Sequence, residues 1–410
     1  MFFLIVALAL AAAYVALMLR YLYGWRTLPT GRPPAGWIPA VRVSVVVPAR
    51  NEAANIAACL ESIAAGTYPA HLVEIIVVDD FSDDDTASLV VQLAEQWKRA
   101  AKNRPHLHLL QLPDFIRPGE TVHSHKKKAI ETGIAQASGE LVVTTDADCI
   151  ASSDWLRLLA AVFYAPGASQ SSASRTDDIH LPNGVAILTA PVLFHREKNL
   201  LQRFQSLDFL GLMGITGAGI QLGTQRMGNG ANLAYPKAVF EAVGGFEGNE
   251  RHASGDDMFL IQKVAARWPS GVFFLKNPAA AVYSEAKPDW RAFVQQRLRW
   301  GTKNAALPEW PVRLALLTVF LFCWSIWLNL ALALAGGDHA RHFAILFLLQ
   351  LALKALADYL LLRDLCRFFD RKDLLKWFAP SFFLHTLYIP LIGTASLFFK
   401  RYNWKGRQVH

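Results

Sequence analysis

Hydrophobic residues are concentrated in four long stretches of the chain, at residues 2–19, 314–335, 343–362 and 378–399. The first, second and fourth stretches contain no acidic or basic residue. A helix needs about 20 apolar residues to cross the hydrocarbon core of a membrane. Each stretch is close to that length, so the pattern predicts four helices that can span or enter a membrane. The alternative is a buried core helix, and it is most open for the fourth stretch.

Basic residues at the ends of these stretches indicate how the chain is oriented. Arg20 and Arg26 follow the first stretch and no basic residue precedes it, which is typical of an uncleaved anchor with its C-terminal side in the cytoplasm. Four full spans would then place the end of the chain outside. The basic residues at positions 400, 401, 405 and 407 favour the inside instead. The fourth stretch is therefore expected to be either a span or a re-entrant or interfacial segment, bent at Pro390 and Gly393.

The region between the first two stretches has an alternating strand and helix pattern. Residues 41–47, 73–78 and 141–145 are short apolar runs, and residues 51–65 have apolar positions at helical spacing. Strands that alternate with helices predict an α/β fold, with a mainly parallel sheet covered on both faces. Ligands of such sheets bind beyond the carboxyl ends of the strands.

These patterns divide the chain into three parts. Residues 1–26 are expected to form an N-terminal transmembrane anchor, and residues 27–310 a cytoplasmic α/β domain. Residues 311–410 are expected to form a C-terminal membrane region, with two spans plus a third span or re-entrant segment. The prediction is a multi-pass protein of the cell membrane.

Composition and charge support the membrane assignment. Hydrophobic residues make up 53% of the chain, which is high for a soluble protein. The net charge is +8, and much of the excess flanks the apolar stretches. Membrane topology and anionic lipids explain this distribution better than nucleic acid does, so no nucleic-acid partner is expected. The four cysteines form no C-x-x-C pair, so neither a disulfide framework nor a zinc site is predicted.

Acidic pairs follow two of the predicted strands directly. Asp79 and Asp80 come after residues 73–78, and two adjacent carboxylates repel each other unless a ligand or a metal compensates. Asp146 and Asp148 come after residues 141–145, and alternate residues of an extended segment point to the same side. Divalent cations such as Mg²⁺ bind carboxylate oxygens together with substrate phosphates. A metal-diphosphate site is therefore predicted here, and an ordinary turn is the alternative.

Two further clusters carry candidate chemistry. In Gly255-Asp256-Asp257 a carboxylate close to a metal and a diphosphate is suited to act as a general base, whereas the structural alternative is a helix start with Asp256 as its N-cap. The segment QRLRW precedes the second apolar stretch and combines arginines, which can neutralise phosphate, with a stacking face at Trp300. Its alternative is a basic, aromatic membrane flank.

In this order, the segments resemble the family 2 glycosyltransferases with a GT-A fold, over residues 41 to about 304. The resemblance is carried by VSVVVPARNEAANIAACLESI (opening strand and helix), VVDDFSDDDT (nucleotide-binding segment), HKKKAIETGIAQASGE (lysine-containing helix), TTDADC (D-x-D), GNGANLAYPKAVFEAVGGF (acceptor-side loop), GDDMFL (base) and QRLRW (Q-x-x-R-W). His125 and Glu131 depart from the family, which often has Gly and Asn at these places.

The resemblance implies a role for each matching residue. The implied nucleotide-sugar-binding residues are Pro48, Asn51, Glu52, Asp79, Asp80, Lys126, Asp146, Gln296, Arg299 and Trp300. The implied metal ligands are Asp146 and Asp148, the implied catalytic residues are Asp257, as the base, and Asp256, and the implied acceptor side consists of Gly230, Asn232 and Trp300. Within the nucleotide-binding segment, Asp80 would read the uracil.

The resemblance also implies an inverting hexosyltransferase with a UDP- or GDP-sugar donor and a divalent metal, Mg²⁺ or Mn²⁺. We expect a lipid or lipid-linked acceptor, because three C-terminal apolar stretches are few for a polymer channel. Residues 193–222 would supply a membrane-level entrance if they form an amphipathic helix, and a core helix is the alternative. The competing hypotheses are a processive polysaccharide synthase, a membrane nucleotidyltransferase and an inactive nucleotide-binding scaffold.

Overall fold

A computed structural model describes residues 2–100, 103–166, 179, 181–248, 255–304, 309–398, 402–404 and 407–409. The basic positions 400, 401 and 405 lie outside these ranges. The strands are β1 (Val43–Ala49), β2 (Val73–Asp79), β3 (His106–Gln111), β4 (Leu141–Thr144), β5 (Ile150–Ala151), β6 (Ile187–Thr189), β7 (Val192–His195), β8 (Leu233–Pro236), β9 (Val272–Phe274), β10 (Val282–Glu285), β11 (Tyr402–Trp404) and β12 (Arg407–Val409). The α-helices are α1 (Phe2–Thr27), α2 (Ile56–Ala64), α3 (Thr86–Arg99), α4 (His125–Gln136), α5 (Trp155–Tyr164), α6 (Leu200–Gln221), α7 (Lys237–Ala242), α8 (Asp256–Arg267), α9 (Trp290–Asn304), α10 (Trp310–Leu334), α11 (Ala340–Phe368) and α12 (Phe378–Phe398).

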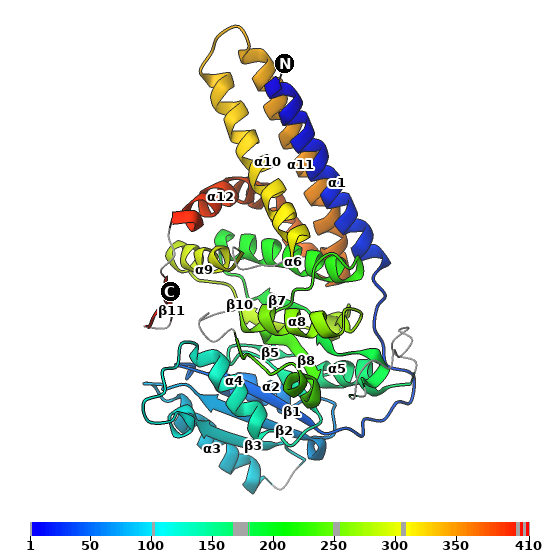
Figure 1. Ribbon diagram of the computed structural model, residues 1–410, viewed down its shortest axis with the longest axis vertical. Coiled ribbons are helices and arrows are strands. Elements are labelled where there is room, and N and C mark those ends of the chain that lie inside the picture. The colour runs from blue at the N-terminus through cyan, green and yellow to red at the C-terminus, as the bar shows by residue number, and fades with distance from the viewer. Residues whose placement is uncertain are drawn as a thin grey trace.

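The main sheet confirms the predicted α/β fold. Its seven strands have the order β3-β2-β1-β4-β8-β6-β9. All neighbouring strands run parallel except β8, which is antiparallel to both β4 and β6. A second sheet has the order β5-β10-β7 and lies between the main sheet and the helices above it (Figure 1). The mainly parallel sheet places the ends of β1, β2 and β4 at one edge.

Both faces of the main sheet are buried, which explains the continuous apolar runs of its central strands. On β1, Val45 and Val47 belong to the same core as Ile56 and Leu60 of α2. Val46 points to the opposite face, where it belongs to a core with residues of α4 and α8. A strand that is buried on both sides has no polar alternation, because neither face meets water.

Four helices are long and apolar enough to cross a membrane, at Phe3–Thr27, Trp310–Leu334, Ala340–Phe368 and Lys372–Phe398. They correspond to the four predicted stretches. Figure 1 shows α1, α10 and α11 side by side in one bundle, whereas α12 runs at a large angle to them, above α9. The two charged residues of the third stretch, Lys354 and Asp358, pair within α11 at 2.5 Å.

Helices α6 and α9 lie across the molecule between the small sheet and the long helices (Figure 1), and we name this pair the interface layer. Helix α6 is the segment predicted as an amphipathic or core helix. Its Leu207 and Leu210 pack with the long helices, whereas Phe209 and Met213 pack with the sheet. The layer therefore connects the two halves of the molecule through apolar contacts on both sides.

A buried ion pair joins the two helices of the interface layer. Arg297 of α9 lies 2.6 Å from the carboxylate of Asp208 on α6, with side-chain exposures of 4% and 5%. The hydroxyl of Tyr388 on α12 donates to the same carboxylate at 3.1 Å. One charge contact thus fixes α6, α9 and α12 relative to one another.

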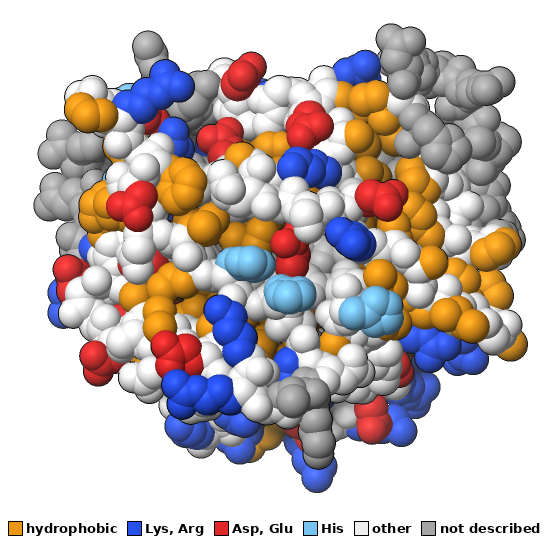
Figure 2. Space-filling view, turned by 90° about the horizontal axis from the view of Figure 1, so that it is seen from below, with side chains coloured by type: hydrophobic (Ala, Val, Ile, Leu, Met, Phe, Trp, Pro, Cys, Tyr) orange, Lys and Arg blue, Asp and Glu red, His pale blue; other side chains and the backbone are white. Residues whose placement is uncertain are grey.

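The opposite end of the molecule has a different surface. Figure 2 shows acidic and basic side chains spread over that end, with hydrophobic side chains between them and histidines near the centre. Large exposed hydrophobic side chains are frequent instead on α1, α10, α11 and α12, as the cases of Leu314, Leu348 and Leu391 show. The molecule therefore has a polar end and an apolar end along its long axis, as expected for a membrane-anchored protein.

Candidate active site

The candidate site lies at the edge of the main sheet where β1, β2 and β4 end. Strand β2 ends at Asp79 and β4 at Thr144, on either side of β1. The strand order reverses at this point, because β2 and β3 lie on one side of β1 and β4 on the other. Ligands of open α/β sheets bind at such a switch point. The acidic residues that follow β2 and β4 are therefore brought to one place.

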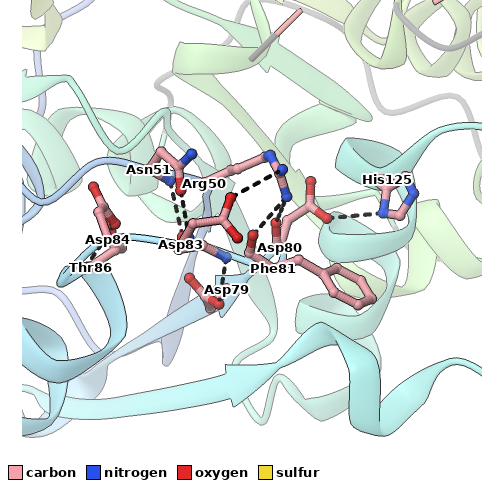
Figure 3. Close-up of polar contacts among 10 residues, drawn as sticks. Arg50, Asn51, Asp79, Asp80, Phe81, Asp83, Asp84, Thr86 and His125 are labelled. Atoms are coloured by element: carbon pink, nitrogen blue, oxygen red, sulfur yellow. Dashed lines mark hydrogen bonds and ion pairs between the residues drawn. The ribbon is translucent and has the colours of Figure 1, made fainter. Parts of the chain in front are cut away.

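The loops that follow β1 and β2 are locked together (Figure 3). The guanidinium of Arg50 donates to the carbonyls of Asp80 and Phe81, each at 2.7 Å. The side-chain carbonyl of Asn51 accepts from the backbone of Asp83 at 2.9 Å. Asn51 and Phe81 have φ angles of 51° and 54°, which are uncommon for residues other than glycine. These turns place both loops beside the carboxylates.

Asp79 and Asp80 are each only 2% exposed. The Asp80 carboxylate lies 2.9 Å from Nδ1 of His125, at the start of α4 (Figure 3). Oδ1 of Asp79 is buried and has no hydrogen-bond partner among the described residues. A buried acceptor without a partner is costly. It suits a ligand that brings hydrogen-bond donors, such as the base or the ribose of a nucleotide.

A second acidic group surrounds Lys126 of α4. The ammonium of Lys126 lies 2.7 Å from Asp146 and 3.7 Å from Asp256. Burial disfavours the charged ammonium, but Asp146, Asp256 and Asp257 outweigh that effect, so the pKa of Lys126 is raised. The cation therefore holds three predicted site carboxylates together.

Asp257 and Gly230 are in direct contact. The backbone N–H of Gly230 donates to the Asp257 carboxylate at 3.1 Å. A Cβ at position 230 would lie 3.0 Å from Oδ2 of Asp256 and 3.6 Å from Cβ of Asp257. The close approach of this loop to the two carboxylates therefore depends on glycine. Helix α8 begins at Asp256 with Gly255 as its N-cap, so Asp256 is not the cap.

Asp148 occupies the side of the site nearest to β10. Its carboxylate accepts from Ser284 at 3.2 Å. Burial and the neighbouring carboxylates of Asp146 and Glu52 raise the pKa of Asp148, while Lys287 opposes them. No group of three acidic, histidine or cysteine side chains converges as a metal site within the described ranges. Two neighbouring carboxylates that disfavour each other's charge nevertheless fit a divalent cation that takes its remaining ligands from a diphosphate.

The predicted residues Gln296, Arg299 and Trp300 lie on α9, in the interface layer. The ring of Trp300 packs at 5.8 Å from that of Phe209, and the guanidinium of Arg297 lies 4.5 Å from its centroid. Oε1 of Gln296 is buried and lacks a hydrogen-bond partner in the part of the chain that the structure describes. These residues form a wall between the sheet and the long helices.

Comparison with known families agrees with this geometry. The family described as Glycosyl transferase family 2 matches residues 44–207, and the Glycosyl transferase family group 2 matches residues 141–392, which is more than half of the chain. The chain is a family 2 glycosyltransferase. A mannosyltransferase of Pyrobaculum calidifontis, solved with GDP-Man and Mn²⁺, has the same fold, with a TM-score of 0.58 and 20% identity over 95% of this chain and 99% of that one.

The names of two curated relatives of this chain contain a lipid. The beta-monoglucosyldiacylglycerol synthase of Synechocystis is 27% identical over 291 residues, which cover 70% of this chain and 53% of the relative. An undecaprenyl-phosphate 4-deoxy-4-formamido-L-arabinose transferase of Photorhabdus laumondii is 34% identical over 108 residues, which cover 26% and 29%. The chain spans little more than half the length of the first curated relatives that it matches.

Asn232 of the glycosyltransferase was expected on the acceptor side, but the structure places it in the interior. The side chain is fully buried, and its amide donates to the carbonyls of Pro191 and Ala280 at 2.8 and 2.9 Å. Its carbonyl accepts from the indole of Trp155 at 2.9 Å. The amide is therefore engaged in holding the loop that carries Gly230.

Sequence reasoning missed a cavity beside Asp148. It has a volume of about 310 Å³ and is lined by Asp148, Lys198, Glu285 and Lys287, among others. The two lysines are far apart in sequence and belong to no motif, so no local pattern could have brought them together. Only the packing of α6 against the small sheet does so.

Proposed function

We propose that this glycosyltransferase transfers a hexose from a UDP- or GDP-sugar to a lipid or lipid-linked acceptor at the cytoplasmic face of the cell membrane, with inversion at the anomeric carbon. The proposal rests on the position of the acidic cluster, by which we mean Asp146, Asp148, Asp256 and Asp257. This cluster lies close to the interface layer of a molecule with four long apolar helices. The names of the two curated relatives support a lipid acceptor.

The donor nucleotide is proposed to bind at the ends of β1 and β2, where Pro48, Asn51, Glu52, Asp79 and Asp80 lie. The partnerless Oδ1 of Asp79 supports this placement. Lys126, next to His125 at the start of α4, would move from the carboxylates towards the diphosphate. Gln296, Arg299 and Trp300 would close the site from α9.

Asp146 and Asp148 are proposed to hold Mg²⁺ or Mn²⁺. The Mn²⁺ in the mannosyltransferase of the same fold supports a metal of this kind. When bound, the cation would stabilise negative charge on the departing nucleoside diphosphate. Burial and the repulsion from Asp146, which together raise the pKa of Asp148, would be offset by the cation at the same time.

Asp257 is proposed as the general base, with Asp256 beside it. The carboxylate would take the proton of an acceptor hydroxyl as its oxygen forms a bond to the anomeric carbon and the bond to the diphosphate breaks. The N–H groups of Gly230 and Met258 donate to the two oxygens of Asp257 at 3.1 and 2.8 Å, which fixes the direction of the carboxylate.

We also propose the division into an anchor at 1–26, a cytoplasmic domain at 27–310 and a membrane region at 311–410. Helix α12 is proposed to lie at the membrane interface, not across the membrane. Its large angle to α10 and α11 and its contacts with α6 and α9 support this placement (Figure 1). The end of the chain would then lie on the cytoplasmic side.

The test is an assay of native membranes with a panel of radiolabelled sugar nucleotides, with and without chelator. We expect label in the organic phase, and its loss in Asp257→Asn and Asp148→Ala variants that melt like the wild type. Asp338→Asn, at an exposed position in the turn between α10 and α11, is the matched control. Near-normal turnover in either site variant would overturn the assignment.

The products separate the other hypotheses. Label in high polymer would indicate a processive synthase, and release of pyrophosphate in place of a nucleoside diphosphate would indicate a nucleotidyltransferase. Metal-dependent nucleotide binding without turnover would indicate a scaffold.

A further inference from the structure

The cavity beside Asp148 connects the acidic cluster to the interface layer. One of its walls is Asp148 itself, and the others come from the start of α6 and the segment that follows β10. An acceptor must reach the anomeric carbon from a side that the nucleotide does not occupy. The nucleotide end of the site, at Asp80 and His125, is formed by different loops. The cavity is therefore placed to receive the acceptor.

The cavity lining contains two lysines and two acidic residues, Asp148 and Glu285. Lys198 and Lys287 both line it, and no acidic side chain lies within ion-pair distance of either ammonium in the described ranges. The acidic residue opposite them, Glu285, lies 3.8 Å from Arg196 and is exposed. Lys287 acts electrostatically on Asp148, so once a divalent metal offsets the charge of Asp148, the two ammonium groups would favour an anion in the cavity.

Buried glutamines of α6 build both lysine positions. Gln202 accepts from the backbone N–H of Lys198 at 2.7 Å and donates to the carbonyl of Ala286 at 3.4 Å. Gln205 holds Lys287 from both sides, accepting from its N–H at 3.0 Å and donating to its carbonyl at 2.9 Å. Gln205 is fully buried and Gln202 is 7% exposed. The backbone at both lysine positions is thus fixed by interior contacts.

Apolar side chains stand next to these lining segments. Leu200 directly follows the lining residue Asn199 and is 38% exposed, and Trp290 follows Pro288 by two residues and is 52% exposed. They begin α6 and α9, the two helices that contact the long apolar helices. A ligand that meets both features has an anionic head and an apolar tail.

We infer that this cavity binds the phosphate of a lipid acceptor, with Lys198 and Lys287 as its counter-charges. The inference rests on the proposed transfer to a lipid and narrows its acceptor to a phosphate-bearing one. If the phosphate itself is a monoester, its oxygen forms the bond to the anomeric carbon as the bond to the diphosphate breaks, and no proton is lost. If the phosphate carries a hydroxyl-bearing head group, the hydroxyl proton passes to Asp257.

The experiment uses the full chain in mixed micelles with its donor and three separate acceptors, a polyprenyl phosphate, phosphatidylglycerol and diacylglycerol. Lys198→Ala and the double variant with Lys287→Ala should raise the KM for a phosphate-bearing acceptor about tenfold or more, as expected for lost charged hydrogen bonds. The KM for diacylglycerol should change by less than about twofold, within the scatter of a surface substitution. Lys198→Arg should restore the lower KM.

Controls test whether the changes in KM come from the cavity lysines. Lys98→Ala, at an exposed position of α3, should leave all three KM values unchanged, and melting curves should show that the cavity variants are folded. Preference for the polyprenyl phosphate or for phosphatidylglycerol identifies the source of the phosphate, and either supports the inference. Inhibition by inorganic phosphate that the double variant loses also supports it.

Failure of this inference can be told apart from failure of the proposed function. A wild-type enzyme that transfers equally well to diacylglycerol, with KM values unaffected by the lysine substitutions, would overturn the phosphate site and leave lipid transfer intact. If no donor is used with any acceptor, the proposed function fails and the inference fails with it.

Discussion

Substitutions in the buried ion pair of Arg297 and Asp208 test how this pair stabilises the interface layer. The perturbation is Asp208→Asn, which removes the charge but keeps an oxygen for the hydroxyl of Tyr388. At the observed 2.6 Å, an effective dielectric constant of about 20 gives an attraction of about 6 kcal/mol. Most of this attraction only offsets the loss of hydration, because both side chains are about 95% buried.

The variant leaves the guanidinium of Arg297 buried without a counter-charge. Loss of one partner of such a pair costs about 3–5 kcal/mol, far more than the pair itself contributes. We therefore expect Asp208→Asn to lower the melting temperature of the full chain in detergent clearly. Arg297→Met should do the same, because it leaves the buried carboxylate of Asp208 without its arginine counter-charge.

The double variant Asp208→Asn/Arg297→Met decides the mechanism. With both charges removed, stability should recover by about 2–4 kcal/mol relative to the sum of the single changes. Arg291→Met, at an exposed position on the same helix, is the control and should stay within about 0.5 kcal/mol of the wild type. Additive single effects, or a wild-type melting curve for Asp208→Asn, would refute this reasoning.

Three other changes have defined outcomes. Burial raises the pKa of Glu74, but hydrogen bonds from Ser44 and from residues 138 and 139 outweigh it, so the folded pKa lies below the ordinary 4.5. The stability that the Glu74 carboxylate adds is present above pH 4.5 and is lost as the pH falls further. Glu74→Gln should therefore lower the melting temperature at pH 7, and the difference in melting temperature from the wild type should narrow in acid. A difference that stays constant with pH would contradict this. A Cβ at Gly133 would lie 2.5 Å from Val46, so Gly133→Ala should cost about 1–3 kcal/mol in thermal unfolding, whereas Gly211→Ala, with ordinary contacts at 3.5 Å, should not destabilise. A chelator should abolish transfer and Mg²⁺ or Mn²⁺ should restore it, and full activity in the chelator would exclude the metal proposed here.

Much of the fold could be predicted because it depends on local patterns. The apolar runs gave the strands at the centre of the sheet and the four long helices. The ends of the helices were predicted less exactly. The apolar spacing indicated a helix over residues 51–65, whereas α2 spans Ile56–Ala64. Its first residues form a turn in which Asn51 has a positive φ and binds the loop after β2. A contact between two loops is not visible in the apolar spacing.

The candidate site could likewise be predicted only in part from the sequence. The carboxylates that follow β2 and β4 could be predicted, because a parallel sheet brings strand ends together. The interior position of Asn232 could not, because its three partners lie on other segments of the chain. The same holds for the contact of Gln205 with Lys287, which are separated by 82 residues. Polar side chains that bind distant backbone leave no periodic signal.

The polarity of the molecule limits where the two substrates can meet. A nucleotide-sugar is soluble in water, and the buried carboxylates of Asp79 and Asp80 lie at the end of β2, in the half of the molecule away from the long helices. The proposed lipid acceptor would approach from the opposite half, past the interface layer. Between them, Asp148 contacts both the acidic cluster and, through Ser284, the small sheet beneath α6. Transfer at this boundary requires neither substrate to cross the protein, so changes near Lys198 should affect acceptor choice and changes near Asp80 should affect donor choice.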